Sequence, residues 1–175
     1  MPTLSRLPNG TTVVTAPHRG ESAAIGLWLE AGSRHEDAAH SGFTHLLEHL
    51  WFDGTRGADA ATLAARLARL GGRVNATTGR ELCALYARAP ADALTGMAGL
   101  LSAMLVRPVE ADHAVRRERA AIALEQQADA RGRLDDHTFA RLWPEHALGR
   151  PVSGEPRALS TVSGAALRRF HAATT

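Results

Sequence analysis

Apolar and polar residues alternate in the first thirty residues with the two-residue period of β-strands. Two short runs, residues 4–7 and 11–15, lie on either side of Asn9-Gly10. An Asn-Gly pair between two such runs is typical of a tight β-hairpin turn. Residues 22–30 carry apolar side chains at every second position of their central part, which predicts a third strand.

The spacing of apolar residues changes from a helical to a strand pattern between residues 58 and 88. Leucines three or four residues apart predict a helix over residues 58–70, and Gly71-Gly72 gives it a natural end. Residues 73–77 and 81–88 then return to the strand pattern and are separated by a short turn. We therefore expect these two segments to form an antiparallel pair.

The second half of the chain has helical periodicity throughout. Pro90 suits the first turn of a helix that continues to Leu105. Three more helices are expected, over residues 110–130, 134–143 and 163–172, with a proline-containing irregular stretch after residue 143. Strands come first and helices follow, so the pattern predicts one α+β domain over residues 1–175 with a largely antiparallel sheet.

Composition narrows the function classes. The formal charge is +2, and the twenty basic residues, all arginine, are mixed with acids rather than with aromatic side chains. This distribution argues against a nucleic-acid surface. Cys83 is the only cysteine and lies in an apolar run, which indicates a small core residue and a reducing compartment. We find neither signal-peptide regions nor a membrane span, and so expect a cytoplasmic protein without membrane contact.

The segment His45-Leu-Leu-Glu48-His49 carries the strongest chemical signal. On a helix starting near Ser41, a plausible N-cap, His45 and His49 lie four residues apart on one face. Two imidazoles in this arrangement can bind one zinc ion, with Glu48 placed to accept a proton from a bound water. The same spacing also suits a solvated helix face without metal, and the motif alone does not decide between them.

A catalytic zinc site needs a third protein ligand. Glu118 and Glu125 lie seven residues apart on the predicted helix 110–130, so both carboxylates lie on one face after two turns. Either could complete a site made of two histidines. The alternative is a charged surface in which Arg116, Arg117 and Arg119 pair with these glutamates. Spacing leaves both interpretations open.

Several segments together resemble the N-terminal catalytic half of the pitrilysin family of zinc peptidases, which includes insulysin and mitochondrial processing peptidase. The resemblance follows the family's order over nearly the whole chain, and its central motif is the inverted form of the common zinc-protease motif. The matching segments are Asn9-Gly10, Ala31-Gly-Ser-Arg34-x-Glu36, His45-x-x-Glu48-His49, Phe52-x-Gly-Thr55, Gly71-x-x-x-Asn75-Ala-x-Thr78, Arg80-Glu81, Glu118 with Glu125, and residues 147–154.

The resemblance implies a role for each matched residue. His45, His49 and Glu125 would bind one Zn2+, and Glu48 would be the general base of a zinc metalloendopeptidase. Glu118 would hold a ligand in place without binding the metal. The family's edge strand, where a substrate peptide adds as a further strand, matches Asn75, Ala76 and Thr78. A purely structural role of Asn75 in shaping a turn stays open.

The chain also departs from the family. Members usually have a second homologous half, and relatives continue beyond the position of Thr175 with a further strand and helix. The family's Arg-Tyr pair for substrate is not matched by Tyr86, the only tyrosine. The resemblance thus implies peptide hydrolysis with a homologous companion subunit, as a heterodimer or a homodimer. The alternative is a non-catalytic subunit that binds peptides or serves as a scaffold.

Overall fold

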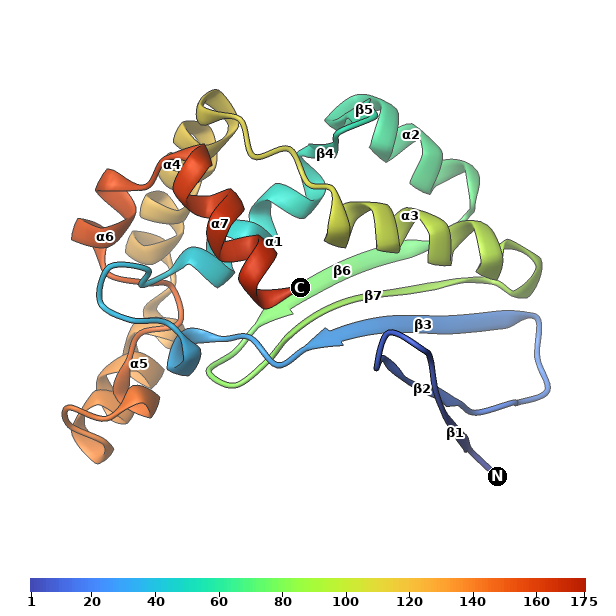
Figure 1. Ribbon diagram of the computed structural model, residues 1–175, viewed down its shortest axis with the longest axis horizontal. Coiled ribbons are helices and arrows are strands. Elements are labelled where there is room, and N and C mark those ends of the chain that lie inside the picture. Colours follow the sequence, from blue (N-terminus) through green and yellow to red (C-terminus); the bar gives the residue numbers. More distant parts are fainter.

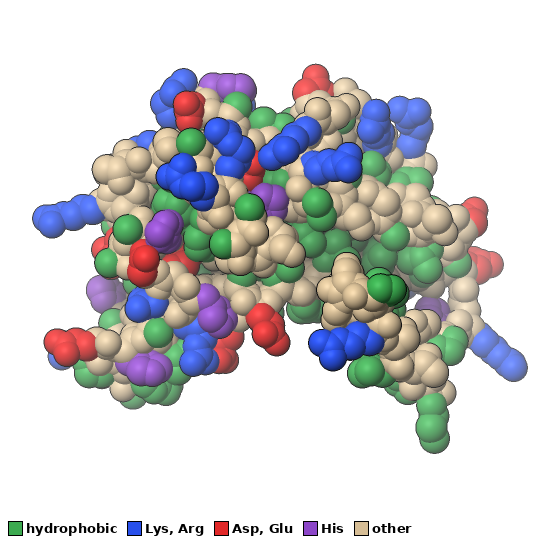
Figure 2. All heavy atoms as spheres, viewed as in Figure 1, with side chains coloured by type: hydrophobic (Ala, Val, Ile, Leu, Met, Phe, Trp, Pro, Cys, Tyr) green, Lys and Arg blue, Asp and Glu red, His purple; other side chains and the backbone are tan.

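The computed structural model describes all 175 residues, and it confirms the α+β class (Figure 1). Strands β1 (Thr3–Arg6) and β2 (Thr12–Thr15) form the predicted antiparallel hairpin, with Gly10 in the left-handed region at its turn. The hairpin has no hydrogen-bonded pairing with the other strands. It stands out from the body at the lower right of Figure 2, with apolar side chains on its surface.

The main sheet has three antiparallel strands in the order β3-β7-β6. Strands β3 (Ser22–Leu29), β6 (Arg73–Thr78) and β7 (Cys83–Pro90) agree closely with the sequence expectations. Alternate residues of the central strand β7 are buried, which marks the face that carries the helices. Both β3 and β6 have one unpaired edge.

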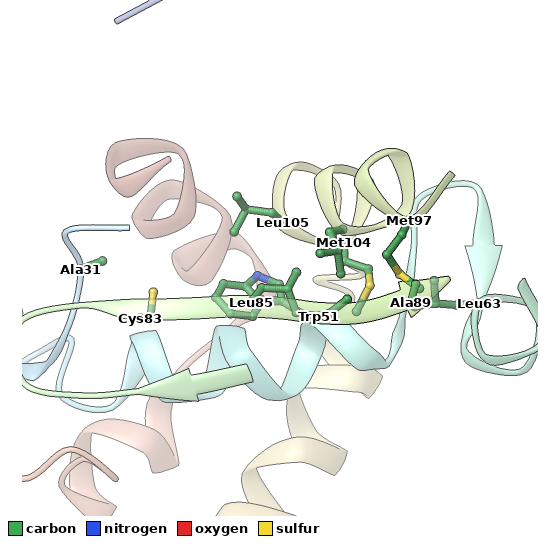
Figure 3. Close-up of a cluster of buried hydrophobic side chains, with 11 residues drawn as sticks. Ala31, Trp51, Leu63, Cys83, Leu85, Ala89, Met97, Met104 and Leu105 are labelled. Carbon is green, nitrogen blue, oxygen red and sulfur yellow. The ribbon is translucent and has the colours of Figure 1, made fainter. Parts of the chain in front are cut away.

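Helices α2 (Ala60–Arg69) and α3 (Leu94–Val106) lie over one face of this sheet (Figure 1). Leu85 of β7, Met97 and Met104 of α3 and Trp51 pack together there in the larger of two hydrophobic clusters (Figure 3). Each of these four side chains is almost fully buried. Removing such apolar surface from water is the main stabilising contribution to this layer.

A second helical layer is built around α1 (Phe43–Phe52). Helices α4 (Asp112–Ala128), α6 (Pro156–Thr161) and α7 (Gly164–Thr174) surround it, and together they bury the second hydrophobic cluster. Helix α5 (Ala130–Leu142) extends from the end of α4 (Figure 1). Because α1 supplies Trp51 to one cluster and Leu46 and Leu50 to the other, it joins the two layers.

The remaining elements are short. They are the strands β4 (Gly54–Thr55) and β5 (Ala58–Asp59) and the 3-10 turns η1 (Ser33–His35), η2 (Ala91–Ala93) and η3 (Ala147–Gly149). Helix α6 lies where we expected an irregular stretch, since Pro156 occupies the first turn of a helix, where proline is favoured. No helix has both the length and the apolar character needed to cross a membrane.

Candidate metal centre

Helix α1 positions the two histidines of the motif. All of its apolar residues except Phe52 are buried, in two separate clusters, so the helix cannot rotate without exposing them. The imidazole rings of His45 and His49 lie on one face, with their centroids 4.9 Å apart. The face is partly buried, with the side chains 11% and 21% exposed respectively. The histidines therefore do not lie on a freely solvated helix surface.

The start of α1 differs from the expectation that Ser41 caps it. The N-cap is Gly42, in the left-handed region at φ 88°, and it has no side chain to accept a helix N–H. The hydroxyl of Ser41 instead accepts the backbone N–H of Glu155 at 3.0 Å. Ser41 thus ties a distant segment to α1, a contact that local sequence does not reveal.

Helix α4 brings both predicted glutamates to the histidines. Glu125 Oε2 lies 3.6 Å from His45 Nε2 and 3.3 Å from His49 Nε2. Two helical turns earlier on the same face of α4, Glu118 Oε2 lies 3.3 Å from Nδ1, the other ring nitrogen of His49. If Nδ1–H donates to Glu118, the Nε2 lone pair of His49 is left pointing towards Glu125.

This donor set fits a zinc ion. The ligand atoms of His45, His49 and Glu125 all lie within 4.8 Å of one another, and no other group of three or more such side chains in the chain converges in this way. Zinc bonds of about 2.0–2.1 Å in a tetrahedron would separate two ligand atoms by about 3.3 Å. The distances of 3.6 and 3.3 Å from Glu125 Oε2 to the two histidine nitrogens are close to this spacing, and three ligands leave a fourth position for water.

Burial keeps one of these ligands neutral. It lowers the pKa of His45 to about 4, with the neighbouring charge of His49 adding to the effect and that of Glu125 opposing it. The Nδ1 atom of His45 is buried without a hydrogen-bond partner, so Nε2 is the nitrogen that meets other polar groups. A neutral imidazole is the form that binds a metal.

Glu48 has the properties of a general base. Burial raises the pKa of its carboxyl, and the negative charge of Glu125 acts in the same direction. The hydroxyl of Thr78 in β6 donates a hydrogen bond to Glu48 Oε2, which opposes the rise and fixes the orientation of the side chain. A carboxylate with a raised pKa accepts a proton more readily at neutral pH than an exposed one.

Cys83 lies close to the centre but is not poised to react. Burial and the nearby charge of Glu48 raise the pKa of its thiol to about 12. The side chain is buried in the larger hydrophobic cluster, between the sheet and the helices that cover it, as the sequence predicted. A thiol in this state is not a nucleophile at neutral pH.

The predicted substrate strand is at the edge of the sheet. β6 pairs only with β7, so its other side is free along Asn75, Ala76 and Thr78. Asn75 Nδ2 donates to Tyr86 Oη at 3.1 Å on the exposed face, whereas Ala76 packs on the core. Thr78 is the residue of this strand that contacts Glu48. Their role towards a substrate stays a prediction.

Two contacts near the centre were not foreseen from sequence. Arg80 donates to Asp136 Oδ1 at 2.7 Å and to the carbonyl of Leu148 at 3.1 Å, and it lies over the Phe139 ring. This fastens the β6–β7 turn to α5. Glu36 is buried against the start of α1. Both belong to matched segments, Arg80-Glu81 and the segment ending in Glu36. The partners of Arg80 are distant in the chain, and the contact of Glu36 with the start of α1 depends on how the intervening loop folds, which no sequence pattern indicates.

Comparison of the sequence with known families finds matches along most of the chain. Residues 12–155 match the family model described as insulinase, peptidase family M16. The β subunit of mitochondrial-processing peptidase from Blastocladiella emersonii is 33% identical over 95% of this chain and 37% of its own length. An uncharacterized zinc protease from Streptomyces coelicolor is 35% identical over 94% of this chain and 37% of its own. The chain thus spans well under half the length of these relatives.

Solved structures share the fold. A protease from Helicobacter pylori superposes with a TM-score of 0.89 at 22% identity, over 98% of this chain and 42% of the other. The periplasmic protease PqqL from Escherichia coli gives 0.87 at 24% identity, over 98% and 20%. An inactive peptidase M16 domain from Pseudomonas fluorescens also gives 0.87, at 19% identity, over 98% and 43%.

Proposed function

The chain belongs to the insulinase family of peptidases, M16, and on that premise we propose that it is the metal-bearing half of a zinc-dependent endopeptidase. The observation that carries the proposal is the convergence of His45, His49 and Glu125 at zinc spacing, with Glu48 on the same helix. The zinc proteases among the relatives support the choice of metal. One bound ion is proposed.

The side chains divide the chemistry between them. His45 and His49 through Nε2 and Glu125 through a carboxylate oxygen would hold the zinc, which would act as a Lewis acid and lower the pKa of water at the open position. Glu48 takes the proton from the attacking water at its carboxylate and passes it to the departing amine nitrogen. Thr78 orients Glu48, and Glu118 fixes the orientation of His49 by accepting its Nδ1–H.

We propose that the substrate is a short or unfolded peptide bound along the free edge of β6. An extended peptide can satisfy the unpaired backbone groups of Asn75 and Ala76 as an added strand. Thr78 ends β6 beside Glu48, so a peptide on this edge passes the general base. The single cysteine suits a reducing compartment, and the cytoplasm is therefore the proposed site of this hydrolysis.

A second, homologous half is proposed as the partner, in a heterodimer or a homodimer. Glu125 is 47% exposed, so the centre faces outwards and needs a cover to exclude bulk water during hydrolysis. The processing-peptidase relatives are named as subunits, which supports a paired arrangement. A dedicated role in peptide processing would fit this pairing.

The competing function is a non-catalytic peptide-binding or scaffold subunit. An inactive domain of the same peptidase family is among the structural neighbours and gives this alternative weight. The presence of Glu48 beside the two histidines argues against this alternative, because peptide binding alone does not require a general base. The two functions differ in what happens when Glu48 is changed.

The test measures cleavage of an unfolded peptide mixture by zinc-loaded protein, with and without the second half. Glu48→Gln should keep zinc but lower hydrolysis about 100-fold or more, the usual contribution of a general base. Glu21→Gln, at an exposed position outside the centre, is the matched control and should cleave at the wild-type rate. Undiminished cleavage by Glu48→Gln would refute the assignment, and zinc binding without cleavage under either condition would favour the scaffold role.

A further inference from the structure

The N-cap residue of the helix that carries both histidines makes no side-chain hydrogen bond to the helix. This residue, Gly42, offers no side chain, and Ser41 is engaged with Glu155. The first N–H groups of a helix have no partner within the helix and need an acceptor from elsewhere. Since Gly42 and Thr44 are buried, water is not a ready substitute.

Glu36 supplies that acceptor from outside the helix. Its Oε2 accepts the N–H of Gly42 and its Oε1 that of Thr44, both at 2.7 Å. The residue is only 2% exposed. A carboxylate at this end also interacts favourably with the helix dipole. One buried side chain therefore satisfies two of the helix N–H groups directly before His45.

Glu36 is itself held from a distant part of the chain. The guanidinium of Arg150 donates to the backbone carbonyls of Arg34 and Glu36, and Ser33 Oγ donates to the Arg150 carbonyl at 3.3 Å. These contacts fix the backbone of the η1 turn and of Glu36, the residue that follows it. The carboxylate is thus presented to α1 by a fixed backbone rather than by a mobile loop.

The same distant segment also reaches the other ligand-bearing helix. Gln126, the neighbour of Glu125 on α4, donates from Nε2 to the carbonyls of Ser153 and Gly154 at 2.9 Å. Gly154 packs against Gly42, and a Cβ on Gly154 would lie 2.4 Å from the Gly42 Cα atom. Residues 150–155 therefore connect η1, the start of α1 and the Glu125 region of α4.

We propose that Glu36 is a positioning residue for the metal centre. This role rests on the zinc site of the proposed function. Glu36 fixes the position of the first turn of α1, and thereby the position of His45 relative to Glu125. His45 follows directly after Thr44, whereas His49 lies a turn further on and is also held by Glu118. Loss of Glu36 should displace His45 first.

The test is the zinc dissociation constant, measured by competition with a chromophoric chelator on folded protein. Glu36→Gln keeps the size of the side chain but replaces one acceptor by an NH2 group that faces a backbone N–H. We expect zinc binding about 10-fold weaker or more, the usual effect of residues that orient ligands. The Co2+-loaded variant should show a changed d–d absorption spectrum, since that spectrum reports ligand geometry.

Asp59→Asn is the matched control, because Asp59 Oδ1 accepts the N–H of Thr62 at the start of α2, a helix without a metal ligand. It should keep the wild-type zinc affinity and cobalt spectrum. If Glu36→Gln does not fold, Glu36→Asp, one methylene shorter, is measured in the same way. Wild-type zinc affinity and spectrum in the Glu36 variant overturn the inference alone. Absence of zinc binding by the wild type overturns the proposed zinc site as well.

Discussion

Helix α1 and the β1–β2 hairpin are of similar size but are stabilised in opposite ways. Seven of the ten residues of α1 are buried. In the hairpin, every strand residue is exposed except Val13, which is half-buried. The hairpin depends on its own turn and strand pairing, whereas α1 depends on residues far away in the chain. The element that bears the chemistry is therefore the one with the least local support.

Contacts from other segments hold α1 in place although its own sequence provides no N-terminal cap. The N-terminal end of α1 is held by Glu36 and by the segment 150–155, and its apolar residues lie in both hydrophobic clusters. Ligand atoms must be held within a fraction of an ångström for metal binding and catalysis. The hairpin contributes no side chain to the centre and has no such requirement.

The largest difference in stability between the two regions is expected when alanine replaces a glycine with positive φ in each. Gly154, at φ 81°, touches the backbone of Ser41 and Gly42, whereas nothing lies within 4 Å of a Cβ on Gly10, at φ 90°. Gly154→Ala should cost about 5 kcal/mol or prevent folding, since backbone atoms cannot move aside. Gly10→Ala should cost only about 1–2 kcal/mol for the left-handed conformation. Urea unfolding measures both, and equal losses would show that the contact is not tight.

Truncating one leucine in each region sharpens the comparison. Leu46 of α1 is 0% exposed, and Leu4 of β1 is 74% exposed. Leu46→Ala should lower the free energy of unfolding by about 3 kcal/mol, because it removes buried surface and leaves a cavity. Leu4→Ala should change it by less than about 0.5 kcal/mol. Comparable losses in chemical denaturation would mean that the hairpin packs against the body in solution.

Acid should weaken the metal-free centre. The pKa of His45 is about 4 in the folded protein and about 6.5 in an unfolded chain, so the unfolded state binds the proton first as the pH falls. Stability present above pH 6.5 should therefore decline towards pH 4, by up to about 2 kcal/mol between pH 7 and 5. Urea unfolding of chelator-treated protein measures this decline.

His45→Gln is the control for that titration. The variant has no imidazole at this position and should lose less stability than the wild type between pH 7 and 5. An identical pH dependence of the two proteins would contradict a buried, neutral His45. The hairpin strands contain no histidine and should not contribute to the difference between the two proteins.

The smallest effect is expected at the other end of α1. Asp53, which follows the helix, forms an ion pair with Arg117, and Arg117 Nε also donates to Glu118 Oε1 at 3.1 Å. The Arg117 side chain is 54% exposed, and exposed pairs contribute less than about 1 kcal/mol. Arg117→Ala should therefore change thermal stability only slightly. A large loss would mean that the C-terminal end of α1 also needs a partner from elsewhere.

Local patterns predicted most of the fold and the chemical groups of the centre. The hairpin, the three sheet strands and most helices follow from periodicity and from glycine or proline at their ends. Helical spacing placed His45 with His49 and Glu118 with Glu125 on shared helix faces but left a metal site undecided, and the resemblance to the peptidase family then implied their roles. The structure brings these side chains together.

What the sequence did not reveal depends on contacts between distant segments. Ser41 has the features of an N-cap, yet its hydroxyl bonds to Glu155, and Glu36 caps α1 from six residues before Gly42. Thr78 was expected only at the substrate edge, but the packing of β6 beside α1 places its hydroxyl on Glu48. No local pattern encodes these pairings, because each is fixed by how the layers pack.

The most direct test of the zinc centre is a titration of metal-free protein with zinc by isothermal calorimetry, repeated for Glu125→Gln and Glu48→Gln. We expect one zinc per chain for the wild type and for Glu48→Gln, because the proposed function makes Glu48 the base and not a ligand. Binding should be lost or weakened at least about 10-fold in Glu125→Gln. Unchanged binding by Glu125→Gln, or loss of the metal in Glu48→Gln, would contradict the assignment of the ligands and the base.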